Sequence, residues 1–462
     1  MKPLIAAAVF GIIMMLSAVF LKEKKQASGL AILLLFLLLG VNIWALTESL
    51  QSGGVATFLF NDMLRFDPFS VWFNVILSGL ALLYVLLNAK HIEVVGNHVA
   101  EYYALLFFIL VGGNLLNAYN NLLILFLGIE IISIPQYILA GSDKRNLKSS
   151  EASLKYLLTG SFSTGIMLMG MALLFGAMGS FDISQFDFGA DGGFNLMAIV
   201  GILFLVVSLS FKVSAAPMHF WTPDVYDGAP TTFTTIMATI VKSAVFVGFM
   251  RLFKDSFSSI SPNWELVVAI ITALTLLIGN ITAVFQQSVK RMLAYSSIAQ
   301  AGFMLFAILA VNARGMQGMV LYAVAYSVAT IGMFTIVAKL RDYTYDGFNG
   351  LARREPFLAF TAAIFLLSLA GIPLTGGFFA KYYMLMSVMS QGGYLTWLVV
   401  FALLMAVVSV YYYFRVIWAM YFKAGEAELT VPVSNADRLL FGISAMIIIA
   451  IGVYPGLVMG WL

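Results

Sequence analysis

Several residue types are missing or scarce in this chain, and each absence excludes a class of protein. There is no cysteine among the 462 residues, which excludes disulfides, thiolate metal sites and iron–sulfur ligation by this chain. Only 10% of the residues are charged, too few to cover the surface of a soluble protein of this size. The net charge of +3 is small and spread over loops, so it gives no sign of nucleic-acid binding.

Motifs that bind an energy source are also missing from the sequence. It contains no phosphate-binding loop, no dinucleotide fingerprint and no pair of histidines placed mid-span for haem. We therefore expect no cofactor in this chain. If the protein pumps ions, its drive must come from a partner or from an ion gradient.

What the chain has in abundance is apolar residues, at 61% of the total. Apolar runs of about 20 residues recur from end to end, the length that spans a bilayer as a helix, whereas a β-barrel would show short alternating segments. The fold class predicted is an all-α polytopic membrane protein with about fourteen transmembrane helices. The expected spans are 4–21, 27–46, 69–88, 101–118, 121–140, 151–178, 196–216, 232–252, 264–284, 290–310, 315–339, 356–389, 395–421 and 438–460.

The basic residues predict how these spans are oriented. Most of the 25 lysines and arginines fall in loops and span ends that share one side if the N-terminus lies outside. Lysine and arginine accumulate on the cytoplasmic side of membrane proteins. Both termini are therefore expected outside, with an even number of crossings, and the longest polar connections are expected at 47–68, 179–195 and 340–355.

A weak internal repeat divides the chain. The run SAAPMHFW around Pro217 and the run SLAGIPLTGGFFAKYY around Pro373 are both rich in small residues with a central proline, which breaks a helix. Each falls in the fourth span of a five-span block, and an odd number of spans makes the two blocks inverted repeats. The expected divisions are N-terminal helices at 1–100, a first repeat at 101–252, a second repeat at 253–421 and a last helix at 422–462.

Four ionisable residues lie near the middle of expected spans: Glu130, Lys212, Lys242 and Lys381. A charge at the bilayer centre costs roughly 2.5–3.5 kcal/mol, so such residues usually face a bundle interior or a water-filled path. Burial disfavours the charged form of either residue type, and a nearby opposite charge restores it. A Glu130–Lys212 pair that forms and breaks would thus let Lys212 take up and release a proton. The alternative is that these groups are static ion pairs that hold helices together.

The identity of the transported cation follows from ligand chemistry. Sodium prefers carboxylate and carbonyl oxygens, but three of the four central groups are lysines, which cannot coordinate a cation while charged. Protons are therefore favoured. His219 lies two residues after Pro217 and is either a relay in the same path or a structural histidine.

Four stretches of the chain resemble a known family. The stretches FKVSAAPMHFWTPDVYDGAPT at 211–231, VKRMLAYSSIAQAGF at 289–303, LGIEIISIPQYIL at 127–139 and LSLAGIPLTGGFFAKYY at 367–383 are similar to the antiporter-like subunits of respiratory complex I. Three details favour one branch of this family over its two larger relatives. They are the sequence TPDVYDGAPT, a lysine at 381, and the expectation that no long lateral helix follows the last span.

The resemblance implies a fold and a role. It implies two inverted five-helix repeats, each with a broken helix, and a hydrated axis of charged residues. Matched motif by motif, Glu130, Lys212, Lys242 and Lys381 fall on the family's proton-transfer positions. The resemblance also implies a multi-pass protein of the bacterial inner membrane, with both termini on the periplasmic side.

The same resemblance implies partners, and it leaves other functions open. NAD, FMN, iron–sulfur clusters and quinone would belong to partner subunits, and the direct neighbours would be another antiporter-like subunit and small membrane subunits. One alternative with the same fold is a subunit of a Mrp-type cation/proton antiporter or of a membrane-bound hydrogenase. Another is a structural subunit that supports assembly without carrying protons.

Overall fold

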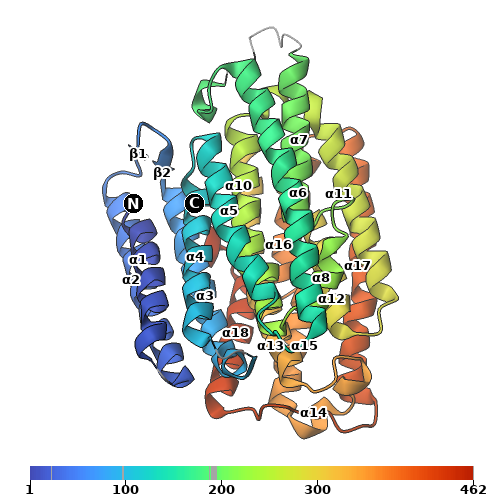
Figure 1. The fold of residues 1–462 in the computed structure, drawn as a ribbon. Helices are drawn as coiled ribbons and strands as arrows, with labels where there is room; N and C mark the ends of the chain where they lie inside the picture. Colours follow the sequence, from blue (N-terminus) through green and yellow to red (C-terminus); the bar gives the residue numbers. More distant parts are fainter. Residues whose placement is uncertain (22, 96–97, 187, 189–194, 461–462) are drawn as a thin grey trace.

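The computed structural model describes residues 1–21, 23–95, 98–186, 188 and 195–460, and most of them form long helices that run side by side (Figure 1). Within these residues, twelve helices are long and apolar enough to cross a membrane. Two shorter apolar helices belong to two further, broken spans. The predicted all-α polytopic class is thus confirmed, and each of the fourteen expected spans has its counterpart.

The first six spans are single helices whose ends lie within a few residues of the expected bounds. They are α1 (Lys2–Phe20), α2 (Lys24–Gln51), α3 (Pro68–Val95), α4 (Val99–Ala118), α5 (Leu122–Ala140) and α6 (Leu147–Met178). The later unbroken spans are α11 (Ser261–Val284), α12 (Val289–Ala310), α13 (Ala313–Lys339), α17 (Tyr394–Phe422) and α18 (Asn435–Val453). Two short helices, α14 (Leu351–Arg354) and α19 (Gly456–Met459), lie in the second half of the chain. Short 3-10 turns lie at Ile183–Gln185, between α6 and α7, and at Ser258–Ile260 and Asp346–Phe348.

Polar residues start many of these helices. The side chains of Asn121, Asn146 and Asn195 each accept a hydrogen bond from a backbone N–H in the first turn of α5, α6 and α7. Ser288 and Asn312 do the same for α12 and α13. These caps satisfy backbone donors that the helix itself leaves free, which is why the helices begin at those residues.

The first broken span consists of α7 (Leu196–Lys212) and α8 (Trp221–Gly228). α7 ends at Lys212, Ser214 adopts a positive φ of 66°, and Pro217 follows. The break frees backbone groups, and the N–H of Ala216 donates to Thr275 Oγ1 of α11 over 2.8 Å. The interrupted backbone is therefore satisfied by a neighbouring helix, as buried backbone at membrane depth requires.

The next span is continuous but irregular. It runs from α9 (Thr231–Ile236) through a π-helical segment (Met237–Val241) into α10 (Lys242–Asp255). Residues 231–253 of this span are all buried inside the bundle. A π segment is a rare local widening of a helix that often marks a functional site. Here it ends at Lys242.

The second broken span consists of α15 (Pro356–Ala370) and α16 (Gly376–Met389). Gly371 and Leu374 in the break have positive φ values of 85° and 70°. Gly377 lies so close to the backbone of Ser368 that a Cβ there would meet its carbonyl oxygen at 1.8 Å. The two broken helices predicted at the fourth position of each five-span block are confirmed.

The connection expected as a polar loop at 47–68 contains a small β-hairpin. Strands β1 (Thr57–Leu59) and β2 (Leu64–Phe66) pair antiparallel through a turn whose residues Phe60, Asn61 and Asp62 all have positive φ. The hairpin lies over the end of α4, where Leu64 bridges to Tyr119. In Figure 1 the N-terminal end of α1 lies toward this end of the bundle.

Candidate functional site

Lys212 closes α7 at the first helix break and is 7% exposed. Its Nζ donates a hydrogen bond of 2.7 Å to Ser133 Oγ on α5 and lies 6.0 Å from the centre of the Tyr137 ring. Residues 133 and 137 are one helical turn apart, so α5 presents both to the lysine from one face. A buried ammonium group thus has a hydroxyl and an aromatic face as its main neighbours.

Glu130 lies on α5 one turn before Ser133 and is half-buried. Its Oε1 accepts a hydrogen bond from Thr164 Oγ1 of α6 over 2.8 Å. In the described part of the chain no ion pair within 4 Å joins Glu130 to Lys212, although the two lie within electrostatic range. The expected pair is therefore open in this structure, with each member held by a neutral hydroxyl.

Lys242 is the most deeply buried of the expected residues, with 1% of its surface exposed. Its Nζ donates to the carbonyl oxygen of Ser297 over 2.8 Å and to the Ser297 hydroxyl over 2.6 Å. The Tyr326 hydroxyl donates to the same Ser297 Oγ over 3.0 Å. Ser297 of α12 is therefore the common contact of the central lysine and of a tyrosine on α13.

A tyrosine connects the first break with this centre. Tyr226 of α8 is fully buried, and its hydroxyl lies beside the hydroxyls of Ser214 and Ser297. Ser214 is two residues after Lys212, inside the break. Hydroxyl groups that both donate and accept thus lie between Lys212 and Lys242.

Lys381 lies on α16, beyond the second break, and is 7% exposed. Its Nζ donates over 3.0 Å to each of the carbonyl oxygens of Leu369 and Ala370, the end of α15. It also lies 4.6 Å from the centre of the Phe303 ring. A cation at the carbonyl end of a helix is favoured by the helix dipole, so the half-helix α15 stabilises the charged form of this lysine.

Polar side chains of α12 and α13 link Lys242 to Lys381. The Gln300 amide donates to the carbonyl oxygen of Leu369 over 2.9 Å, the same oxygen that Lys381 contacts. Tyr322 donates its hydroxyl to Gln300 Oε1. A cavity of about 10 Å³ lies among these residues, Tyr326 and Lys381, which is about the space that one water molecule needs.

His219 takes no part in this chain of contacts. It is half-buried in the loop before α8, and within the described residues no hydrogen bond joins its ring to any of the three lysines. Its Nδ1 is buried without a hydrogen-bond partner in the described chain. The structure thus joins Lys242 to Ser297 and brings Gln300 and Lys381 to the same carbonyl oxygen. Lys212 and Glu130 are held by separate hydroxyls on α5 and α6, and His219 lies apart.

Sequence reasoning missed the hydroxyl and amide groups of the network. Ser133 lies one helical turn after Glu130, so helical spacing could have found it. Ser297 and Gln300 on α12 and Tyr322 and Tyr326 on α13 share no helix with a predicted site residue, and local spacing gave no signal for them. Sequence reasoning also missed buried cations. Lys290 and Lys339 lie at the ends of expected spans but are only 3% and 1% exposed. The Nζ of Lys290 donates to the carbonyl oxygens of Asp227 and Ala229. Lys339 forms an ion pair with Asp437 at 2.9 Å.

No cluster of three or more histidine, aspartate or glutamate side chains is placed to hold a metal ion within the residues that the structure describes. The groups that the site offers are instead amines, hydroxyls, amides and one carboxylate. All of these donate, accept or exchange protons.

Comparisons with known proteins show which family the chain belongs to. Residues 119–408 match a family model described as NADH:quinone oxidoreductase/Mrp antiporter, TM. The chain is 37% identical to an NADH-quinone oxidoreductase subunit N from Cytophaga hutchinsonii, over 99% of both chains. It is also similar to a chain of respiratory complex I from Thermus thermophilus, with 31% identity, 99% and 98% of the chains covered and a TM-score of 0.84.

A chain of the Mrp complex from Dietzia has the same fold at a TM-score of 0.84, but only 18% of its residues are identical, with 100% and 96% of the chains covered. That likeness concerns the fold alone. The family match and the relatives above place the sequence more narrowly. The chain belongs to the family of NADH-quinone oxidoreductase subunit N, the antiporter-like membrane subunits of complex I.

Proposed function

We propose that this chain translocates protons across the bacterial inner membrane through the axis Glu130–Lys212–Lys242–Lys381, driven by redox chemistry on partner subunits of NADH:quinone oxidoreductase. The observation that carries the proposal is the placement of the three lysines. All three are buried where a helix is irregular: Lys212 ends α7 at the first break, Lys242 follows the π segment, and Lys381 lies just beyond the second break. Hydroxyl and amide side chains lie beside them.

Each lysine has neutral contacts that suit a group that changes charge. Lys212, Lys242 and Lys381 donate to hydroxyl and carbonyl oxygens, and none makes an ion pair with a carboxylate within the described residues. A buried ion pair would hold a lysine charged, whereas the hydroxyls beside Lys212 and Lys242 accept a hydrogen bond from NH₃⁺ and can donate one to NH₂. The carbonyl partners of Lys381 only accept. This argues for carriers over static ion pairs.

The proposed sequence of events begins at Glu130. A charge change on a neighbouring subunit shifts Glu130 toward or away from Lys212 and so favours the charged or the neutral form of that lysine. Loss of a proton from Lys212 lowers the repulsion on a proton at Lys242, and the effect passes through Ser297 and Gln300 toward Lys381. Moving one charge against the membrane costs about 2.3 kcal/mol per 100 mV, which the partner must supply.

The same proposal also assigns the redox cofactors to other subunits. NAD, FMN, the iron–sulfur clusters and quinone belong to other subunits in this proposal, and the neighbours in the membrane are a second antiporter-like subunit and small membrane subunits. The second candidate function is that of a subunit of a Mrp-type antiporter, and only the similarity of the fold supports it. Copurification of flavin and iron–sulfur subunits with the chain distinguishes the two.

The test is proton uptake by sealed inverted vesicles energised with NADH, for the wild type and for Lys212→Met. We expect Lys212→Met to remove most of the uptake while NADH oxidation by detergent-solubilised complex continues, because a methionine fills the space but carries no proton. Lys25→Met is the control, since Lys25 is exposed at the start of α2. Full uptake by an assembled Lys212→Met complex would contradict the role of this lysine.

A further inference from the structure

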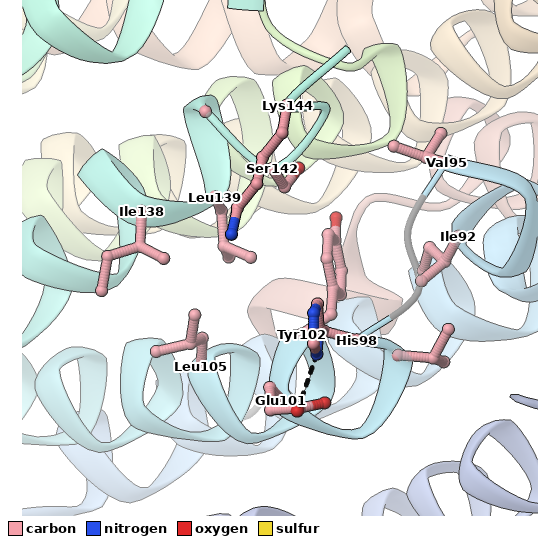
Figure 2. A pocket seen from close by; sticks show the side chains of 12 residues that line it. Ile92, Val95, His98, Glu101, Tyr102, Leu105, Ile138, Leu139, Ser142 and Lys144 are labelled. Carbon is pink, nitrogen blue, oxygen red and sulfur yellow. Dashed lines mark hydrogen bonds and ion pairs between the residues drawn. The ribbon is translucent and has the colours of Figure 1, made fainter. Parts of the chain in front are cut away.

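An open cavity of about 340 Å³ lies between α3, α4 and α5, at the opposite end of the bundle from the β-hairpin (Figures 1 and 2). Its floor is apolar and is formed by Ile92, Val95, Leu105, Ile138 and Leu139. The volume falls within the range of small-molecule sites in proteins. None of the residues of the proton-transfer axis lines it.

The mouth of this cavity is polar and carries a lysine. Lys144 extends from the loop after α5 toward the cavity in Figure 2, and it makes no ion pair within the described residues. Glu101, the acidic group at the mouth, is paired with His98 at 3.1 Å. The mouth therefore offers the exposed ammonium group of Lys144 to an anionic group, beside the hydrogen-bonded pair of His98 and Glu101.

The apolar floor extends into the membrane. Leu105 is six residues into α4, about 9 Å below its start at 1.5 Å per residue. Ile138 is 55% exposed, so the cavity also opens sideways through the outer face of α5. A soluble anion would leave the apolar floor without a contact, and an acyl chain alone would leave Lys144 at the mouth without one.

We propose that this cavity binds one anionic phospholipid, with the phosphate at Lys144 and an acyl chain along Leu105 and Ile138. The two-part lining matches the two parts of the lipid, and the mouth lies where the spans end and headgroups begin. Basic pockets between membrane helices are known to take anionic headgroups. The lipid would fill the gap between the N-terminal helices and the first repeat, where α3 meets α4 and α5.

The experiment uses the whole purified complex in vesicles of phosphatidylglycerol and phosphatidylcholine, with a trace of photoactivatable phosphatidylglycerol. Cross-linked peptides are identified by mass spectrometry. We expect wild-type label on residues 98–105 and 138–144, and about fivefold less in Lys144→Glu because one basic contact to the headgroup is lost. Leu105→Trp, which fills the floor, is expected to reduce the label as well. Arg145→Glu is the matched control, since Arg145 is exposed and does not line the cavity.

Three outcomes would overturn the proposal. The first is unchanged label in Lys144→Glu, an exposed substitution that leaves the fold intact. The second is equal labelling of the wild type by a photoactivatable phosphatidylcholine, which would exclude recognition of the anionic headgroup. The third is a partner subunit's side chains filling the cavity in a structure of the assembled complex. A native gel checks assembly for each variant, so a failure of Leu105→Trp to assemble leaves Lys144→Glu decisive.

Discussion

The two broken helices occupy the same place in their five-span blocks but are held in different ways. The first is held from outside: Lys212 donates to Ser133 of α5, and Ala216 donates to Thr275 of α11. The second is held from within: Lys381 reaches back to carbonyls of α15, and the N–H of Gly377 donates to Ser368 Oγ of the same span. The first break thus takes these contacts from other helices, whereas the second closes mainly on its own span, with one further hydrogen bond from Gln300 of α12 to the Leu369 carbonyl oxygen.

This difference suggests a division of roles. A lysine held by a side chain of another helix responds when that helix changes, and Glu130 lies on the same helix as the Ser133 acceptor. A lysine that donates to backbone carbonyls of its own span is less affected when a neighbouring helix moves. In the proposed function, Lys212 is the responsive end of the axis and Lys381 the fixed end.

The largest effect is expected where the second break closes on itself. In Gly377→Ala the added Cβ would lie 1.8 Å from the carbonyl oxygen of Ser368, a backbone atom that cannot give way. We expect little or no assembled complex on a native gel. Gly165→Ala is the control, because nothing lies within 4 Å of a Cβ there. Normal amounts of assembled Gly377→Ala complex would show that the second break is not rigid.

A smaller effect is expected at the first break. Ser133→Ala removes the only hydroxyl that Lys212 donates to in the described chain, and a hydrogen bond to a charged group contributes about 1.5–3 kcal/mol. We expect roughly tenfold slower NADH-driven proton uptake with normal assembly. Ser78→Ala serves as the control, since Ser78 bonds only to carbonyls of its own helix. Unchanged proton uptake in Ser133→Ala would show that Lys212 does not depend on its contact with α5, and the two breaks would then not differ in the way described.

The smallest effect on pumping is expected far from both breaks, at Asp67 before α3. Its carboxylate pairs with Arg251 at 2.8 Å and Arg65 at 2.9 Å. Burial alone would raise its pKa, but the charges of the two arginines outweigh burial and hold the pKa below its ordinary value. Since the folded-state pKa is depressed, this stabilisation is complete above the unfolded pKa of about 3.9 and is lost as the pH falls through the folded value.

We therefore expect Asp67→Asn to lower the thermal midpoint of the complex by about 5 °C at pH 7, because Arg251 loses a buried counter-charge. The difference should shrink only as the pH approaches about 4. Uptake per assembled complex should not change. Asp346→Asn is the control, since its carboxylate is 79% exposed and 3.9 Å from Lys423. A difference that grows on acidification would contradict the sign of the pKa shift.

The spans, the two breaks and the burial of the three lysines could be predicted from the sequence. Runs of apolar residues of membrane-spanning length predict the spans, prolines within them predict the breaks, and charges in mid-span predict burial. The sequence was not sufficient for the contacts. The π segment before Lys242 has no local sequence signal, and the hairpin at Thr57–Phe66 lies in a stretch read as polar loop. The state of the Glu130–Lys212 pair depends on the packing of α5, α6 and α7, which periodicity does not specify. Lys290 and Lys339 were missed because their position near span ends normally means exposure.

The most direct test of the central claim is NADH-driven proton uptake by vesicles carrying Lys242→Ala, with assembly checked on a native gel. Lys242 is the central lysine of the proposed axis, and it donates to Ser297 on α12. The account predicts normal assembly and loss of most of the uptake. Uptake at the full wild-type rate would contradict it, and would return the buried lysines to a purely structural role.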